Sequence, residues 1–383
     1  MAGKTITMLA VGDNLLVMNN PEINFALAAP VLRSGDIVVG QLETPCTSRP
    51  EITAPWSGIG HPHGLPRGCD PKRLEALKSA GFNVIHLAGN KIWDAGGPGI
   101  EDTINGLRKL GIAPVGAGMN LDEARTPAII ERKGTKVGFL SYNCVGPNQT
   151  WANPMKPGCA WVRIVTAYEV DHPTPGSNPT IYTFADPDSL KAMIADIQKL
   201  RPLCDVLVVH FHKGIGMTPI KLAMYEQSVS YAAIDAGADL ILGEHAHMLR
   251  AAELYKGKVI YHGMGHFVPF DPDAKPEERP EWMVAQQQKI MSELVGYKLP
   301  GKQEWPSDND SRLTMIAKII IAGGKISRTA FLPCIINDRG QPEVLKHDER
   351  GQRVFDYMEK ITRVIGLDTG YEWDGDEIVI NSI

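Results

Sequence analysis

The sequence predicts an α/β protein built around a largely parallel or mixed β-sheet. Two observations lead to this prediction. Short β-branched runs alternate with amphipathic helical segments from residue 6 to residue 262, and almost every run ends in a polar residue that could bind a ligand. Alternating β and α elements pack as layers around a sheet. The composition, 43% hydrophobic and 22% charged with a net charge of −5, is that of an ordinary soluble chain.

The individual elements follow from periodicity and from start and stop signals. The segment 71–81 has a proline in its first turn and ends at Gly81, which marks a helix. A hairpin is expected over 128–132 and 135–141, and a strand pair over 311–322 and 325–332 that turns at Gly323-Gly324. Further strands are expected over 6–11, 37–41, 83–87, 112–115, 205–210 and 238–242, and further helices over 100–110, 186–200, 224–236, 281–294 and 352–365.

Two long segments rich in proline and glycine interrupt this alternation, at 44–69 and 143–183. Loops of that length in a compact domain are usually functional or disordered. The aromatic residues of 143–183 favour an ordered lid or wall. His61 and His63 in the first loop could reach over a site, but a surface position is the more ordinary one for them.

Composition excludes several classes of protein. A mildly acidic chain without a basic run does not favour nucleic acid as a partner. No apolar window has membrane-spanning length, and the N-terminal run leads directly into Gly12-Asp13, so we expect a first strand and a cytoplasmic protein with no membrane anchor. The six cysteines are scattered and lack metal-type spacing. We expect buried free thiols, although the even number permits disulfides.

Histidines cluster in the second half of this pattern. Six of the eleven lie between residues 210 and 266, and they occur in pairs that follow candidate strands. Imidazole is a preferred ligand of zinc, iron and manganese-class metals. The clustering therefore indicates a metal site or an acid–base site formed by members of three pairs: His210 and His212, His245 and His247, His262 and His266.

Carboxylates and other polar residues follow the earlier strands. Asp13 ends the first strand, Glu43 follows the second, and Asn90, Lys91 and Asp94 follow the strand at 83–87. Ligands of open α/β sheets bind at the carboxyl ends of the strands. Carboxylates and imidazoles at that edge suit a divalent metal that activates water or polarises an oxygen. Each residue taken alone has a plainer explanation, since Asp is a common cap and Asn a common turn former.

Eight short motifs identify a family resemblance. The chain resembles the CapA family, the poly-γ-glutamate capsule-biosynthesis proteins, whose fold is similar to that of calcineurin-like metallophosphatases. The resemblance implies a four-layer α/β/β/α sandwich with mixed sheets, a catalytic domain over 1–270, and a C-terminal extension over 271–383 that completes the same domain. The motifs begin at Gly12-Asp13, Gln41-Leu42-Glu43, Gly81-Phe82, Gly116-Ala117-Gly118, Val137-Gly138, His212-Lys213-Gly214, Gly243-Glu244-His245-Ala246-His247 and Tyr261-His262.

The resemblance carries metal-binding or catalytic positions to Asp13, Glu43, Asn90, His212, His245 and His247. Several positions depart from the pattern. Leu15 stands where metallophosphatases have a histidine, and Lys91 replaces another. His266 stands where the family has an asparagine, and the family's His-Trp-Gly-x-Glu is His212-Lys213-Gly214-Ile215-Gly216. Since two imidazoles are absent, we expect one metal, or a rebuilt site, and not a dinuclear centre.

The remaining candidates receive roles from their chemistry. Lys91 and Lys213 would attract an anionic substrate such as a carboxylate, and Glu244 could orient an imidazole or act as a general base. Candidates for catalytic roles are His210, His212, Glu244, Lys91 and His266, and candidates for substrate binding are Trp151, Trp161, Lys213 and Asn143.

Together these patterns predict a hydrolase that depends on a divalent metal, either Mn, Zn or Fe. The expected substrate is a small molecule or a short γ-peptide that carries a carboxylate and is cleaved at an amide, ester or lactone bond, with a γ-glutamyl-like bond as one candidate. A homo-oligomer is compatible with the sequence. The alternatives are a phosphoesterase, a non-catalytic accessory protein of polyglutamate or capsule synthesis, and a metal-free acid–base lyase.

Overall fold

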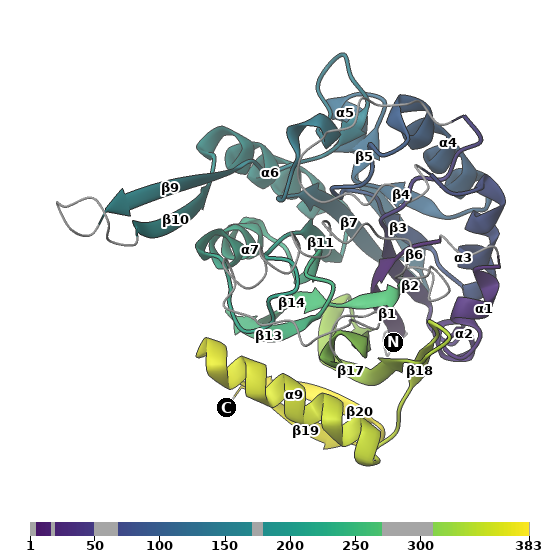
Figure 1. The fold of residues 1–383 in the computed structure, drawn as a ribbon, viewed down its shortest axis with the longest axis vertical. Coiled ribbons are helices and arrows are strands. Elements are labelled where there is room, and N and C mark those ends of the chain that lie inside the picture. The colour runs from purple at the N-terminus through teal and green to yellow at the C-terminus, as the bar shows by residue number, and fades with distance from the viewer. Residues whose placement is uncertain (1–4, 17–19, 50–67, 171–178, 270–308, 383) are drawn as a thin grey trace, which may run out of the picture.

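The computed structural model describes residues 5–16, 20–49, 68–170, 179–269 and 309–382. Two β-sheets pack face to face, and helices cover the outer face of each sheet (Figure 1). This is the four-layer α/β/β/α arrangement that the family resemblance implies. The expected helix over 281–294, together with His61 and His63, lies outside the described residues.

The first sheet has β1 (Ile6–Asn14) near its middle. Parallel strands β2 (Ile37–Leu42), β3 (Val84–His86) and β4 (Ala113–Val115) extend it on one side. On the other side, β16 (Leu313–Ala322) pairs antiparallel with β1, and the sheet continues through β17 (Lys325–Ile336), β20 (Glu377–Ser382) and β19 (Thr369–Asp374). Two short strands pair alongside, β15 (His266–Val268) with β1 and β18 (Pro342–Val344) with β17. Strands from the predicted C-terminal extension thus lie beside β1, while the division at residue 270 stays a prediction.

The second sheet contains four parallel strands: β7 (Thr135–Asn143), β11 (Val206–His212), β12 (Leu240–Glu244) and β14 (Lys258–Met264). Antiparallel strands β6 (Ala128–Arg132) and β13 (Leu249–Tyr255) form its edges. Side chains alternate along each strand. On β11, Val206 and Val208 pack into the core between the sheets, whereas Leu207 and Val209 pack toward the helices.

Helices complete the outer layers. The first sheet is covered by α1 (Glu22–Phe25), α2 (Ala29–Leu32), α3 (Glu75–Ala80) and α4 (Gly96–Lys109), and the second by α6 (Pro187–Leu200) and α7 (Met224–Ala236). The C-terminal helix α9 (Glu349–Ile365) packs against β13, β17 and β19 (Figure 1). The predicted strands and helices within the described residues are present, with ends that differ by a few residues. The helix expected over 71–81 begins as a 3₁₀ turn, Pro71–Leu74.

The segment expected to form a lid or wall has two parts. Residues 144–162 hold only short elements, Asn148–Thr150 and β8 (Gly158–Cys159), the latter paired with β5 (Ala117–Gly118). The strands β9 (Ile164–Val170) and β10 (Pro179–Ala185) then form a two-stranded arm that projects from the body of the molecule (Figure 1). The second half of the expected lid is therefore an extended arm.

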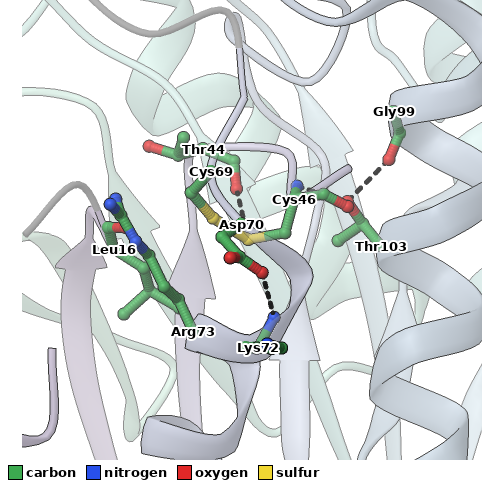
Figure 2. Close-up of a disulfide and its surroundings, with 9 residues drawn as sticks. All are labelled: Leu16, Thr44, Cys46, Cys69, Asp70, Lys72, Arg73, Gly99 and Thr103. Carbon is green, nitrogen blue, oxygen red and sulfur yellow. Dashed lines mark hydrogen bonds between the residues drawn. A yellow bond between two sulfur atoms is a disulfide. The ribbon is translucent and has the colours of Figure 1, made fainter. Parts of the chain in front are cut away.

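Cys46 and Cys69 form a disulfide, which corrects the expectation of free thiols for this pair (Figure 2). The other four cysteines are free. The Cys46 amide donates to Thr103 Oγ1 of α4 at 2.8 Å, so the disulfide lies between the end of β2 and that helix. Disulfides are typical of oxidising compartments, not of the cytoplasm that the sequence led us to expect. Within the described part of the chain, no helix combines the length and the apolar character needed to cross a bilayer.

Candidate metal centre

The candidate ligands meet where the strands of both sheets end. Asp13, near the end of β1, is the register partner of His266 in β15. A side chain at Gly12 would overlap the Gly265 carbonyl oxygen, so glycine is needed for this close approach. His212 ends β11, and Glu43 lies one residue beyond β2. The candidate side chains therefore gather at the carboxyl ends of the strands, where ligands of open α/β sheets bind.

Two groups of three side chains have the spacing of metal ligands, and Asp13 belongs to both. They are Asp13, His247 and His266, and Asp13, Glu43 and His212, with ligand atoms within 4.8 Å of one another in each group. Asp13 Oδ1 and Glu43 Oε1 are buried without a hydrogen-bond partner. Leaving carboxylate oxygens buried and unpaired is costly. A cation bound between them would remove that cost, so these residues fit a divalent metal.

His212 has its ring oriented by Gln41, a residue that the sequence analysis did not single out. His212 Nδ1 lies 3.0 Å from Gln41 Oε1, while Gln41 Nε2 donates to the Ala88 carbonyl oxygen at 3.4 Å. Burial, together with the nearby His245, His247 and Lys91, holds the pKa of His212 well below its usual value, so the ring is neutral. We assign the single ring proton to Nδ1, which leaves the Nε2 lone pair directed into the centre.

Three further polar atoms surround His212 Nε2. Asn90 Oδ1 and His245 Nδ1 each lie 3.1 Å away, and Glu43 Oε1 lies 3.6 Å away. With the Nδ1 tautomer, Asn90 Oδ1 and His212 Nε2 face one another as two acceptors. A shared cation would stabilise such a pair of atoms. Asn90 and His245 were predicted as ligands and lie at this position.

His245 and His247 hold unusual backbone conformations. Their φ angles are 97° and 57°, in the left-handed region that residues with a side chain rarely adopt. The His245 amide donates to Asp13 Oδ2 at 3.3 Å. His247 Nδ1 lies 3.2 Å from the same oxygen, and the His247 ring stacks on His266 with 4.1 Å between ring centroids. The turn after β12 thus places the His245 amide and the His247 imidazole against one oxygen of Asp13.

The carboxyl groups of the centre differ in protonation. Burial and the neighbouring Glu43 raise the pKa of Asp13 to about 6. Burial opposes ionisation of Glu43 as well, but Lys91, with Nζ 2.9 Å from Glu43 Oε2, lowers the pKa of Glu43 to about 2. Burial, with Asp13 and Glu43 nearby, raises the pKa of Glu244 well above its usual value. At neutral pH, Glu43 is therefore ionised.

His210 lies outside the two groups, in the core between the sheets. Its Nδ1 is 2.9 Å from Ser141 Oγ, and its ring stacks on His86 with centroids 4.3 Å apart. Both rings are buried. His86 was missed as a relevant residue. Its position in the strand predicted over 83–87 was the available signal, because that strand leads directly to Asn90.

Lys213 does not lie beside the candidate ligands, where the expected role in attracting an anionic substrate would place it. Its side chain follows His212 by one residue and so lies on the opposite face of the sheet, toward α7. Lys213 Nζ donates to Ser230 Oγ at 2.7 Å and lies 3.0 Å from His262 Nδ1, and the side chain is fully buried. His262 is likewise in this group, with Nε2 2.7 Å from Glu253 Oε2. The structure thus separates Lys213 and His262 from Asp13 and its neighbours.

Trp151 and Trp161 stack with 4.7 Å between ring centroids, and both are half-buried. Trp161 Nε1 donates to the Ala152 carbonyl oxygen at 3.0 Å. Asn143 is buried and donates to Thr150 Oγ1 at 3.2 Å, so its amide is directed into this segment. Cys159 Sγ lies 3.9 Å from the carbonyl oxygen of Gly89, the residue before Asn90. The segment therefore borders the centre on the Asn90 side.

Comparison with known proteins gives the family. The model of the family described as bacterial capsule synthesis protein PGA_cap matches residues 5–270. The chain belongs to this family. Similar PGA_cap relatives include the capsule biosynthesis protein CapA of Bacillus anthracis, 25% identical over 69% of this chain and 59% of the relative, and the PGA biosynthesis protein CapA of Bacillus subtilis (strain 168), 27% identical over 64% and 56%. The chain thus spans less than two thirds of the length of these PGA_cap relatives.

A probable polyglutamine synthesis accessory protein of Mycobacterium tuberculosis is 30% identical over 63% of this PGA_cap chain and 58% of that protein. Among solved structures, a hypothetical protein from Thermus thermophilus has a TM-score of 0.45 at 14% identity, covering 86% of this chain and 98% of its own. A calcineurin-like phosphoesterase from Bacillus subtilis has a TM-score of 0.37 at 13% identity, and the match covers 94% of this chain and 98% of the phosphoesterase.

Proposed function

We propose that this PGA_cap family member is a metal-dependent hydrolase that cleaves an amide bond in a carboxylate-bearing substrate of γ-glutamyl type. The observation that carries the proposal is the set of polar atoms around His212 Nε2, together with the buried, unpaired oxygens of Asp13 and Glu43. The substrate class is suggested by the names of the relatives, which refer to capsule and polyglutamate synthesis.

In this proposal, the residues of the centre have different roles. Glu43, Asp13 and His212 would hold the metal, with Asn90 and His245 beside them. A divalent ion such as Mn, Zn or Fe polarises a carbonyl oxygen and lowers the pKa of bound water. Gln41 fixes the His212 ring, and Lys91 keeps Glu43 ionised. Trp151 and Trp161 offer a wall for the apolar part of the substrate on the Asn90 side.

The test is turnover of a γ-glutamyl amide panel by protein loaded with Mn²⁺, Zn²⁺ or Fe²⁺. We expect activity that is lost on chelation and in Asp13→Asn and His212→Gln. The matched control is His347→Gln, because His347 stacks on Trp373, which belongs to the C-terminal strand β19. Turnover that survives His212→Gln would contradict the assumed site. No turnover of amides or esters, with capture of synthase subunits in a pulldown, would favour the accessory role.

A phosphoesterase is the second candidate, since one observation favours it. Asp13 is shared between two groups of ligands, and a carboxylate placed between two metal sites is suited to phosphoester cleavage by two ions. A phosphomonoester and phosphodiester panel therefore belongs in the same assay. Faster turnover of phosphoesters than of γ-glutamyl amides would select this function over the amide hydrolase.

A further inference from the structure

We propose that the arm formed by β9 and β10 joins two copies of this chain, with β9 of one copy paired antiparallel to β9 of the other about a twofold axis at Ala167. The pairing converts two arms of two strands into one sheet of four strands. The arm projects from the body of the molecule, so that two copies can bring their arms together (Figure 1). This inference is independent of the proposed hydrolase.

The arm carries an apolar face from the core out into solvent. Ile164 and Ala185 are register partners at its base, and both pack against the buried cluster beneath α6 and α7. Tyr168 and Ile181 are register partners four residues farther out, so they lie on the same face. Their exposed fractions are nevertheless 68% and 54%. Two strands alone are marginally stable in water, whereas three or more strands with an apolar face are stable. Additional strands would therefore stabilise the outer half of the arm.

The strand β9 has an edge that can accept another strand. Within the described residues, β10 is the only strand that pairs with β9. Natural sheets protect such edges with proline, lysine or a bulge. β9 contains neither proline nor lysine, and its register with β10 runs over seven residues without a bulge. In contrast, β10 begins at Pro179 and lies against α7, since the Tyr225 amide donates to Thr183 Oγ1 at 3.3 Å. The edge of β9 is therefore the one available for pairing.

The sequence of β9 is compatible with pairing to a second copy of itself. Ala167 is the middle residue of the strand, and antiparallel pairing about it places Thr166 opposite Tyr168, and Val165 opposite Glu169, of the second copy. The two Glu169 residues are then about 14 Å apart along the strands, so no like charges face each other. The register also keeps the apolar faces of both arms on the same side of the sheet. These features favour a second copy as the partner.

The same register places an apolar side chain of one copy near an exposed apolar surface of the other. Tyr168 of the second copy lies opposite Thr166, which is the register partner of Thr183, the residue that contacts the start of α7. Met224 at the start of α7 is 56% exposed, and Ile220 in the preceding loop is 52% exposed. The start of α7 therefore offers Tyr168 of the second copy an apolar surface.

The size of the arm sets the expected strength of association. Strands of seven residues are about 24 Å long, and a ribbon of two strands is about 10 Å wide, so each arm covers on the order of 240 Å². Standard protein interfaces bury about 800 Å² per partner, and weak, transient ones bury less. We therefore expect a reversible dimer with a dissociation constant of about 10 μM.

The first experiment is sedimentation velocity of the full chain between about 1 and about 200 μM. The sedimentation coefficient should rise from that of a monomer to that of a dimer over this range. Tyr168→Glu should weaken self-association at least about tenfold, because pairing would bury an unpaired carboxylate. Met155→Glu is the matched control, since Met155 is 92% exposed and lies outside the arm, and it should associate as the unchanged protein does. Circular dichroism verifies the folding of each variant.

The second experiment tests the register by cross-linking. Residues directly opposite each other on antiparallel strands have Cβ atoms about 4.5–5.5 Å apart, close to the spacing of a disulfide. Ala167→Cys should therefore form a covalent dimer when oxidised with diamide. Thr180→Cys is the matched control, because Thr180 lies on the same face of the arm but on β10, three strands away from its copy. It should stay monomeric on a non-reducing gel.

A protein that stays monomeric over the whole concentration range would overturn the inference. So would self-association that Tyr168→Glu leaves unchanged, or equal cross-linking of the two cysteine variants. None of these outcomes bears on the proposed hydrolase, because turnover of the γ-glutamyl panel is measured separately.

Discussion

Removing the disulfide is expected to destabilise the protein by about 3 kcal/mol. The change is the double substitution of Cys46 and Cys69 by alanine. The two cysteines are 23 residues apart, and closing a loop of that length removes chain entropy worth roughly 3 kcal/mol from the unfolded state. Three backbone and side-chain hydrogen bonds hold the segment independently of the sulfur atoms: Thr47 amide to Cys69 oxygen, Cys69 amide to Pro45 oxygen, and Cys46 amide to Thr103 Oγ1, each 2.8 Å. Because these contacts survive the substitution, the loss arises mainly through the unfolded state.

The assay is urea unfolding followed by circular dichroism, with and without a phosphine reductant. Reductant should lower the free energy of unfolding of the unchanged protein to that of the double variant, and it should leave the double variant unaffected. Cys334→Ala is the matched control, since Cys334 is buried but free and its variant should keep the full response to reductant. Thiol titration in denaturant should find four thiols before reduction and six after it. Six thiols without reductant, or a double variant as stable as the unchanged protein, would refute the reasoning.

Three further predictions concern buried charges and metal. Glu226→Gln should cost about 3–5 kcal/mol in urea unfolding, because it removes the negative charge that balances the fully buried Arg250, whose guanidinium donates to Glu226 Oε2 at 2.6 Å. Glu101→Gln, in an exposed pair with Arg49, should cost less than about 1 kcal/mol, and equal losses would contradict this. Burial raises the pKa of Asp94 from 3.8 to about 7. The folded state therefore binds the Asp94 proton more tightly than the unfolded state does. The resulting contribution to the free energy of unfolding is complete below pH 3.8 and is lost as the pH rises through 7. The melting temperature of the metal-free protein should fall more steeply between pH 4 and pH 8 than that of Asp94→Asn. The same dependence of melting temperature on pH in both proteins would contradict this prediction. Metal at 100 times its dissociation constant should stabilise the protein by about 2.7 kcal/mol, reversed by chelator and absent in His212→Gln.

The sequence determined the α/β class and brought the candidate site residues to one edge of the strands. Alternating β and α periodicity is local, and it predicted the parallel strands β1, β2, β3, β11 and β12. Because the carboxyl ends of neighbouring parallel strands share an edge, the residues that follow them had to gather, and Asp13, Glu43 and His212 do so. The motifs quoted from the sequence also predicted the family, which the match over residues 5–270 confirms.

Only the tertiary structure decided which candidates meet. Side chains alternate on a strand, so His212 points to the centre while the next residue, Lys213, lies beneath α7. The spacing of the motifs does not show which of the two faces the centre. The stack of His86 on His210 joins strands of two different sheets. The pairing of Cys46 with Cys69 requires the chain that leaves β2 to come back beside the end of that strand before α3 begins. Contacts of this kind depend on how layers and loops pack over long sequence separations, whereas local periodicity records only which face of its own element a residue occupies.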